Sequence, residues 1–173
     1  MRILPRVMWE IPNVSKHTFT QASAAILRAV SKYQFDGIVL ECPVVPATTN
    51  FLIKLAGVMH RVKSGAKQLV LVVPPSLASS ARGEQAADVA RVAAAVHALS
   101  LMTYDYSVHQ GRAGPNAPLR WSVDTAAALV ALVTRALPKS VAAHVDASST
   151  ARKVLMGIPF YGSVHERAAA GHA

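Results

Sequence analysis

Five continuous apolar runs, separated by stretches of helical periodicity, are the feature that most restricts how this chain can fold. They are rich in β-branched residues and leucine, without regular polar alternation: Ile3–Trp9, Gly37–Val45, Gln68–Pro75, Leu99–Ser107 and Lys153–Gly162. Runs of this kind are typical of parallel strands that are buried on both faces of a sheet. We therefore expect five parallel strands.

Between these runs, apolar residues recur at spacings of three and four, as in amphipathic helices. The four stripes extend from Phe19 to Tyr33, Leu52 to Val62, Val89 to Leu99 and Ala126 to Leu137, and Ser122 is the expected N-cap of the last. Alternating strands and helices in units of about 30 residues are typical of parallel α/β folds. Either a doubly wound sheet or part of a (β/α)8 barrel would fit this pattern.

The composition indicates a globular chain of about one domain. Of its 173 residues, 52% are apolar and 16% are charged, which excludes an intrinsically disordered composition. Lysine and arginine exceed the acids by 18 to 9, but the basic residues are scattered and no nucleic-acid-binding motif accompanies them. We expect no nucleic-acid partner. No apolar run approaches the ~18 to 20 residues of a membrane span, and no signal peptide is recognisable at the N-terminus.

The sequence predicts neither a metal site nor a cofactor. Cys42 is the only cysteine, so an internal disulfide is impossible, and its apolar neighbours predict a small core residue. The seven histidines lack the spacing of metal ligands. Gly111 and Gly114 belong to a loop that lacks the strand-turn-helix context of a phosphate-binding loop.

Three short motifs, in order on successive expected strands, resemble glycoside hydrolase family 18, the chitinase-like barrels. FDGIVLE (35–41) resembles the start of the family's fourth-strand motif, DGxDxDxE. LMTYDYS (101–107) is similar to its sixth-strand motif MxYD, and LMGIPFYG (155–162) to its seventh-strand motif GxPFYG. A narrower resemblance, to the chitinase domain-containing protein 1 group, runs from about Ile3 to Gly162.

The resemblance implies a partial (β/α)8 barrel in residues 1–162, covering roughly the third to seventh βα units. A complete barrel has eight strands and about 250 residues, and the first, second and eighth strands have no counterpart here. We expect the open edges to favour self-association. Residues 163–173 match nothing in the family and are expected to be a disordered tail. The resemblance suggests a secreted, endomembrane or lysosomal location, although the sequence leaves the compartment unknown.

The catalytic acid of the family is missing from the fourth-strand motif. Family resemblance implies substrate-assisted hydrolysis, in which a protonated glutamate at the strand end donates its proton to the leaving oxygen. Aligned on Asp36 and Gly37, the motif places Val39 and Glu41 at the inner aspartates and Pro43 at the catalytic glutamate. Proline has no proton to give. Glu41 lies two residues back, roughly 6 to 7 Å deeper at ~3.3 Å per residue, so we expect no catalytic residue.

The remaining motif residues favour binding of a chitin oligosaccharide. The resemblance implies that Tyr104 and Asp105 hold the N-acetyl group, beside Met102 of the same motif. Flat aromatic faces suited to sugar rings and an amide with donor and acceptor groups add candidate contacts: Tyr106, Trp121, Tyr161 and Asn116. Glu41 completes the candidate substrate-binding set, and we expect Arg6 on the adjacent strand to neutralise it.

Two other functions remain open at this point. One is a glycosidase for β-1,4-linked N-acetylglucosamine polymers in which the acid has moved to another position. The other is an inactive, truncated scaffold. A fold alone does not decide among these possibilities, because function depends on the groups at the site.

Overall fold

The computed structural model describes residues 1–9, 16–62, 67–136, 147–162 and 164. They contain one five-stranded sheet in the order β1-β2-β3-β4-β5, and every neighbouring pair is parallel. The strands are β1 (Arg6–Met8), β2 (Gly37–Glu41), β3 (Gln68–Val73), β4 (Ala98–Leu101) and β5 (Val154–Met156). The five predicted parallel strands are therefore confirmed, with shorter bounds.

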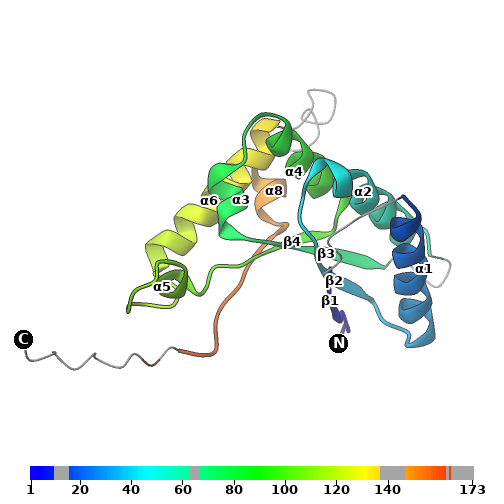
Figure 1. Ribbon diagram of the computed structural model, residues 1–173, viewed down its shortest axis with the longest axis horizontal. Helices are drawn as coiled ribbons and strands as arrows, with labels where there is room; N and C mark the ends of the chain where they lie inside the picture. Colours follow the sequence, from blue (N-terminus) through cyan, green and yellow to red (C-terminus); the bar gives the residue numbers. More distant parts are fainter. Residues whose placement is uncertain (10–15, 63–66, 137–146, 163, 165–173) are drawn as a thin grey trace, which may run out of the picture.

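The helices lie on one side of this sheet, arching over it as Figure 1 shows. The longer ones are α1 (Lys16–Lys32), α2 (Pro46–His60), α4 (Gly83–Ala95) and α6 (Leu119–Ala136). Shorter helices are α3 (Pro75–Ser80), α5 (Tyr106–His109) and α8 (Ala147–Ala151). A doubly wound sheet carries helices on both faces, so the one-sided cover fits the partial barrel. Within the described residues the barrel is open, with β1 and β5 as its edges.

Alternate strand residues face the helices and form the core. Ile38, Leu40, Leu69, Leu71, Leu99 and Leu101 are each at most 2% exposed. The opposite, concave side of the sheet carries Arg6 beside Val39 and Met8 beside Glu41 by strand register. Val39 and Glu41 are partly exposed, and Met8 is 54% exposed. Around β1 and β2, the face that would line a closed barrel is thus accessible to solvent.

Asp36 and Gly37 hold the amino ends of three strands together. The Ile3 N–H donates to Asp36 Oδ2 at 2.7 Å, and the Gln68 N–H donates to the Asp36 carbonyl at 2.9 Å. A Cβ on Gly37 would lie only 2.0 Å from the Gln68 carbonyl oxygen, so β2 and β3 approach here only because residue 37 is glycine. The Asp-Gly start of the motif therefore has a structural role.

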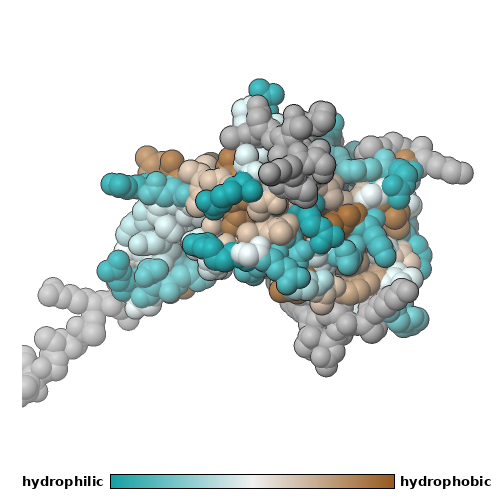
Figure 2. Space-filling view, turned by 90° about the horizontal axis from the view of Figure 1, so that it is seen from above, coloured by the Kyte–Doolittle hydropathy of each residue, from teal (hydrophilic) through white to brown (hydrophobic). Residues whose placement is uncertain are grey.

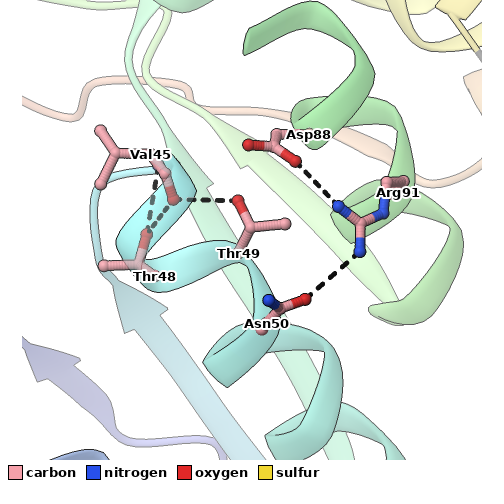
Figure 3. Close-up of polar contacts among 6 residues, drawn as sticks. All are labelled: Val45, Thr48, Thr49, Asn50, Asp88 and Arg91. Atoms are coloured by element: carbon pink, nitrogen blue, oxygen red, sulfur yellow. Dashed lines mark hydrogen bonds and ion pairs between the residues drawn. The ribbon is translucent and has the colours of Figure 1, made fainter. Parts of the chain in front are cut away.

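Polar contacts fix the start of α2 and join it to α4 (Figure 3). Thr48 Oγ1 accepts from the Val45 N–H at 3.1 Å, which satisfies a donor at the start of the helix. Arg91 of α4 donates to Asn50 Oδ1 at 3.3 Å and to Asp88 Oδ1 at 3.0 Å. The Asp88 side chain is only 7% exposed, so this ion pair offsets the cost of burying its carboxylate.

Several element boundaries differ from the sequence-based expectation. β4 ends at Leu101, because the following residues leave the ladder and Asp105 adopts a left-handed conformation, with φ of 60°, before α5 begins. Leu99 belongs to β4 and not to a helix. Ser122 is not an N-cap: α6 begins at Leu119, and the Ser122 N–H already donates to the Pro118 carbonyl at 3.0 Å.

The last predicted strand is also shorter than expected, since only Val154–Met156 pairs with β4. Beyond it the chain leaves the sheet (Figure 1), and Phe160 is fully exposed. Cys42 is buried as predicted, and burial raises the pKa of its thiol to about 11. The prediction for the tail falls on residues that, apart from Val164, lie outside the described part of the chain.

Hydrophilic and hydrophobic residues are interspersed over the helical side of the molecule (Figure 2). In the described part of the chain, no helix combines the length and the apolar character needed to cross a membrane.

Candidate functional site

The sequence-predicted site residues lie beyond the carboxyl ends of the strands. Pro43 follows β2, the segment Met102–Asp105 follows β4, and Tyr161 lies five residues past the end of β5. In barrels and open parallel sheets, ligands bind at this end because loops of variable sequence converge there. The candidate site is therefore at the end of the sheet where chemistry is expected.

Asp105, Asn116 and Tyr161 form a hydrogen-bonded cluster, which we call the acid–tyrosine cluster. The Tyr161 hydroxyl donates to Asp105 Oδ1 at 2.7 Å, and the Asp105 N–H donates to Asn116 Oδ1 at 2.6 Å. Asn116 Nδ2 in turn donates to the Tyr161 carbonyl at 3.1 Å. The pKa of the Tyr161 phenol is raised, first because its hydroxyl donates to the Asp105 carboxylate. Each member thus fixes the position of the other two.

Asn116 already uses both functions of its amide within this cluster. Its oxygen accepts from Asp105 and its nitrogen donates to Tyr161. The oxygen keeps a second lone pair and the nitrogen a second N–H, so the sugar contact expected of Asn116 stays a prediction. The Asn116 carbonyl also accepts from the Tyr106 N–H at 2.9 Å, which holds the turn after Asp105. The geometry therefore makes Asn116 a residue that positions the cluster.

Tyr104 reaches the same site through a close approach to Gly157. A Cβ on Gly157 would lie 2.7 Å from Tyr104 Cε1 and 2.9 Å from the Leu101 carbonyl oxygen. Thr103 Oγ1 donates to the Gly157 carbonyl at 2.8 Å and holds the two segments together. The Tyr104 and Tyr161 rings meet edge to face, with centroids 6.5 Å apart. Sequence reasoning did not single out Gly157 or Thr103, because their role depends on contacts between segments distant in the sequence.

Tyr106 and Trp121 lie in a different environment from the acid–tyrosine cluster. Their rings pack against each other at a tilt of 51°, with centroids 5.0 Å apart. Together with Met102 they line a cavity of about 580 Å³ between α3, α5 and α6. The structure therefore divides the predicted sugar-contacting residues into two groups, one around Asp105 and one around Trp121.

The predicted pairing of Arg6 with Glu41 is confirmed. Arg6 Nε donates to Glu41 Oε2 at 3.0 Å, and a second guanidinium nitrogen contacts the same oxygen. The pair is only partly shielded, since the Arg6 and Glu41 side chains are 53% and 33% exposed. The pKa of Arg6 is raised by its hydrogen bond and charge interaction with Glu41. The pair thus engages the carboxyl group of Glu41 with the Arg6 cation.

Pro43 marks the position where the family motif carries its acid. It is exposed, it follows β2 by two residues, and its carbonyl accepts from the Thr48 hydroxyl at the start of α2. Its ring offers no titratable group. Among the described residues, no three His, Cys, Asp or Glu side chains gather in a metal-binding arrangement.

A family model and a curated relative both match this chain over most of its length. The model of the glycosyl hydrolases family 18 matches residues 12–172. Chitinase A1 of Niallia circulans is 31% identical over 170 residues, which covers 86% of this chain and 23% of that protein. The chain thus spans about a quarter of the length of this curated relative.

Solved structures agree on the fold. A C-terminal domain from Desulfitobacterium hafniense DCB-2 matches with a TM-score of 0.66 at 23% identity, over 92% of this chain and 46% of that one. A chitinase from Chromobacterium violaceum ATCC 12472 matches with a TM-score of 0.61 at 20% identity, over 91% and 48%. The chain spans a little under half of each. The narrower resemblance to the chitinase domain-containing protein 1 group stays a prediction.

Proposed function

The chain belongs to the glycosyl hydrolases family 18, and we propose that it is a chitinase-like domain that binds chitin oligosaccharides without hydrolysing them. The observation that carries this proposal is which residues stand at the acidic positions of the motif in β2 and directly after it. Pro43 stands where the family motif has its acid, and the nearest motif carboxylate, Glu41, is held in an ion pair by Arg6. A general acid must carry a proton within about 3 Å of the oxygen that receives it.

Binding depends, in this proposal, on the acid–tyrosine cluster. Asp105 Oδ1 accepts from Tyr161, which leaves the second carboxylate oxygen to accept from a sugar N–H or hydroxyl. Tyr104 and Tyr161 offer ring faces and polar edges on the open side of the sheet, and Tyr161 is 54% exposed. Such amphipathic surfaces suit a pyranose ring, which has both apolar C–H faces and hydroxyl edges.

We further propose that residues 1–162 act as one barrel-type unit and that its open edges support self-association. The β5 edge adjoins an apolar groove with a cavity of about 670 Å³, lined by residues of α6, α8 and β5 that include Val130, Val154 and Met156. Exposed strand edges next to apolar surface favour pairing with another chain.

Titration of the chain with a chitin tetrasaccharide, followed by isothermal calorimetry, tests the binding proposal. We expect saturable heat release that is weakened by Asp105→Ala or Tyr104→Ala. Tyr33→Ala is the matched control, because Tyr33 is an exposed tyrosine that follows α1 and precedes β2, so it lies away from the carboxyl ends of the strands. Equal affinity in all three variants would remove the proposed site.

A further inference from the structure

The cavity between α3, α5 and α6 is distinct from the acid–tyrosine cluster and has no role in the proposed function. Its volume of about 580 Å³ lies within the range of ligand pockets, about 300 to 1,000 Å³. The wall is formed by Pro74, Met102, Tyr106 and Trp121, while Gln110 and Asp124 lie at its polar rim. An apolar wall with a few polar groups is the usual composition of a small-molecule site.

The apolar wall offers a flat surface that suits a sugar ring. Tyr106 and Trp121 are partly exposed and tilted against each other, so part of the aromatic surface is available to a ligand. Aromatic rings of this kind bury the C–H face of a flat partner and keep a polar edge near water. Pro74 and Met102 extend the same wall with further apolar surface.

The rim supplies groups that match sugar hydroxyls. The Asp124 side chain is 69% exposed, and its contact with Arg120, at 3.7 Å between highly exposed groups, is too weak to occupy it. Gln110 is exposed and carries both a donor and acceptors. A carboxylate and an amide beside an aromatic wall can recognise hydroxyls on one edge of a pyranose ring.

The cavity also has the right position for a ligand. Pro74 directly follows β3 and Met102 directly follows β4, so the cavity opens at the carboxyl ends of two neighbouring strands. Met102 and Tyr106 flank the segment that carries Tyr104 and Asp105. The two sites therefore share a backbone segment but have different lining residues.

We propose that the cavity between α3 and α6 is a second saccharide site, which takes one pyranose ring against Trp121 and Tyr106. The choice of a saccharide as ligand rests on the proposed function, whereas the site itself uses none of the residues of the acid–tyrosine cluster. Oligosaccharide binding at the two sites is therefore separable by mutation.

Tryptophan fluorescence gives a direct measurement. The chain has two tryptophans, and Trp9 packs against Phe19 and Phe51 at centroid distances of 5.7 and 5.2 Å, so Trp9→Phe preserves an aromatic ring there. In that variant Trp121 is the sole reporter. Titration with a chitin trisaccharide is expected to shift its emission in a saturable way, and the shift is expected to persist when Asp105→Ala is added.

Two substitutions on α6 form a matched pair, in which one tests the site and the other is its control. Ala128 lines the cavity, whereas its neighbour Ala127 lines the groove on the other side of α6. Ala128→Phe should fill the cavity and weaken the affinity measured by Trp121 fluorescence by about tenfold or more. Ala127→Phe should leave this affinity unchanged. An unchanged response in Ala128→Phe, or no response in the parent, would overturn the proposal.

The two proposals fail in different ways. Calorimetric binding that depends on Asp105, without a change in Trp121 emission, would contradict the second site and leave the proposed function intact. A Trp121 response without Asp105-dependent binding would support the second site and contradict binding at the acid–tyrosine cluster. If Trp9→Phe fails to fold, the unsubstituted chain labelled with 5-fluorotryptophan gives the same information, because only one of its two fluorine resonances should move on addition of the trisaccharide.

Discussion

Arg6 and Glu41 form an ion pair across the first two strands, with both guanidinium contacts on the same carboxylate oxygen. The pair lies on the concave side of the sheet, at strand positions where a closed barrel of this family points its inner side chains. It therefore engages the carboxyl group of the motif that lies nearest to Pro43 in the sequence.

The first prediction concerns the strength of this pair. Because both side chains are a third or more exposed, we expect a coupling free energy of less than about 1 kcal/mol. A double-mutant cycle with Arg6→Met and Glu41→Gln, measured by urea unfolding, gives this value. We expect the coupling to fall at high salt because partly exposed charges are screened. A salt-independent coupling of several kcal/mol would show that the pair is buried.

The second prediction concerns the approach of Tyr104 to Gly157. A methyl group at residue 157 would overlap both the Tyr104 ring and the Leu101 carbonyl, so Gly157→Ala should destabilise the chain by about 1 to 3 kcal/mol and weaken sugar binding. Gly162→Ala is the matched control, because a Cβ at Gly162 meets no atom within 4 Å. Thermal unfolding and calorimetric titration of the two variants check this. Equal effects at both positions would contradict the described packing.

The third prediction concerns pH. His60 Nε2 and His97 Nδ1 lie 3.0 Å apart, and the Leu69 N–H also approaches His97 Nδ1, at 3.3 Å. Burial, followed by the charges of His60, Lys153 and Arg2, lowers the pKa of His97. The unfolded chain, with a histidine pKa of about 6.5, then binds more protons than the folded chain below that pH. Stability should be full above this pH and should decline as pH falls below it.

The free energy of unfolding at pH 7.5 and pH 5.5 measures the effect. His97→Gln removes the titrating ring and should make the loss between the two pH values smaller. His109→Gln is the control, because His109 is an exposed histidine on α5. An equal loss in the parent chain, His97→Gln and His109→Gln would show that His97 does not cause the pH dependence.

The fourth prediction concerns self-association. Sedimentation of residues 1–173 should show a concentration-dependent increase in mass, because the β5 edge and its apolar groove are open. Met156→Lys should reduce this association by placing a charge in the groove, whereas Val58→Lys on α2 should not. The two side chains are each 41% exposed, so the substitutions are matched in accessibility. A monomer at every concentration would rule the prediction out.

The sequence predicted the sheet more accurately than the site. Continuous apolar runs predicted all five parallel strands, including β1 and β5, which are largely exposed at the edges of the sheet. The strand register pairs Arg6 with Val39, two residues before Glu41. The runs overestimated strand length beyond Leu101 and Met156, because apolar residues such as Met102 and Phe160 also occur where no ladder continues.

Side-chain partners at the site depended on contacts that periodicity does not encode. The use of both Asn116 amide functions by Asp105 and Tyr161 joins segments 11 and 45 residues away along the chain. The packing of Trp121 against Tyr106, beside a cavity that Asp105 does not line, likewise joins segments that the motifs do not relate to each other. The residue types of the site could be predicted from motifs, but their grouping could not.

Mass spectrometry of a chitin hexasaccharide incubated with the chain tests whether the chain binds chitin without hydrolysing it. We expect the hexasaccharide to stay intact at the rate of a buffer control, while calorimetry on the same sample records binding that Asp105→Ala weakens. Release of shorter oligosaccharides would contradict this expectation if the products disappear in Glu41→Gln, because that result would make Glu41 the acid despite its ion pair with Arg6.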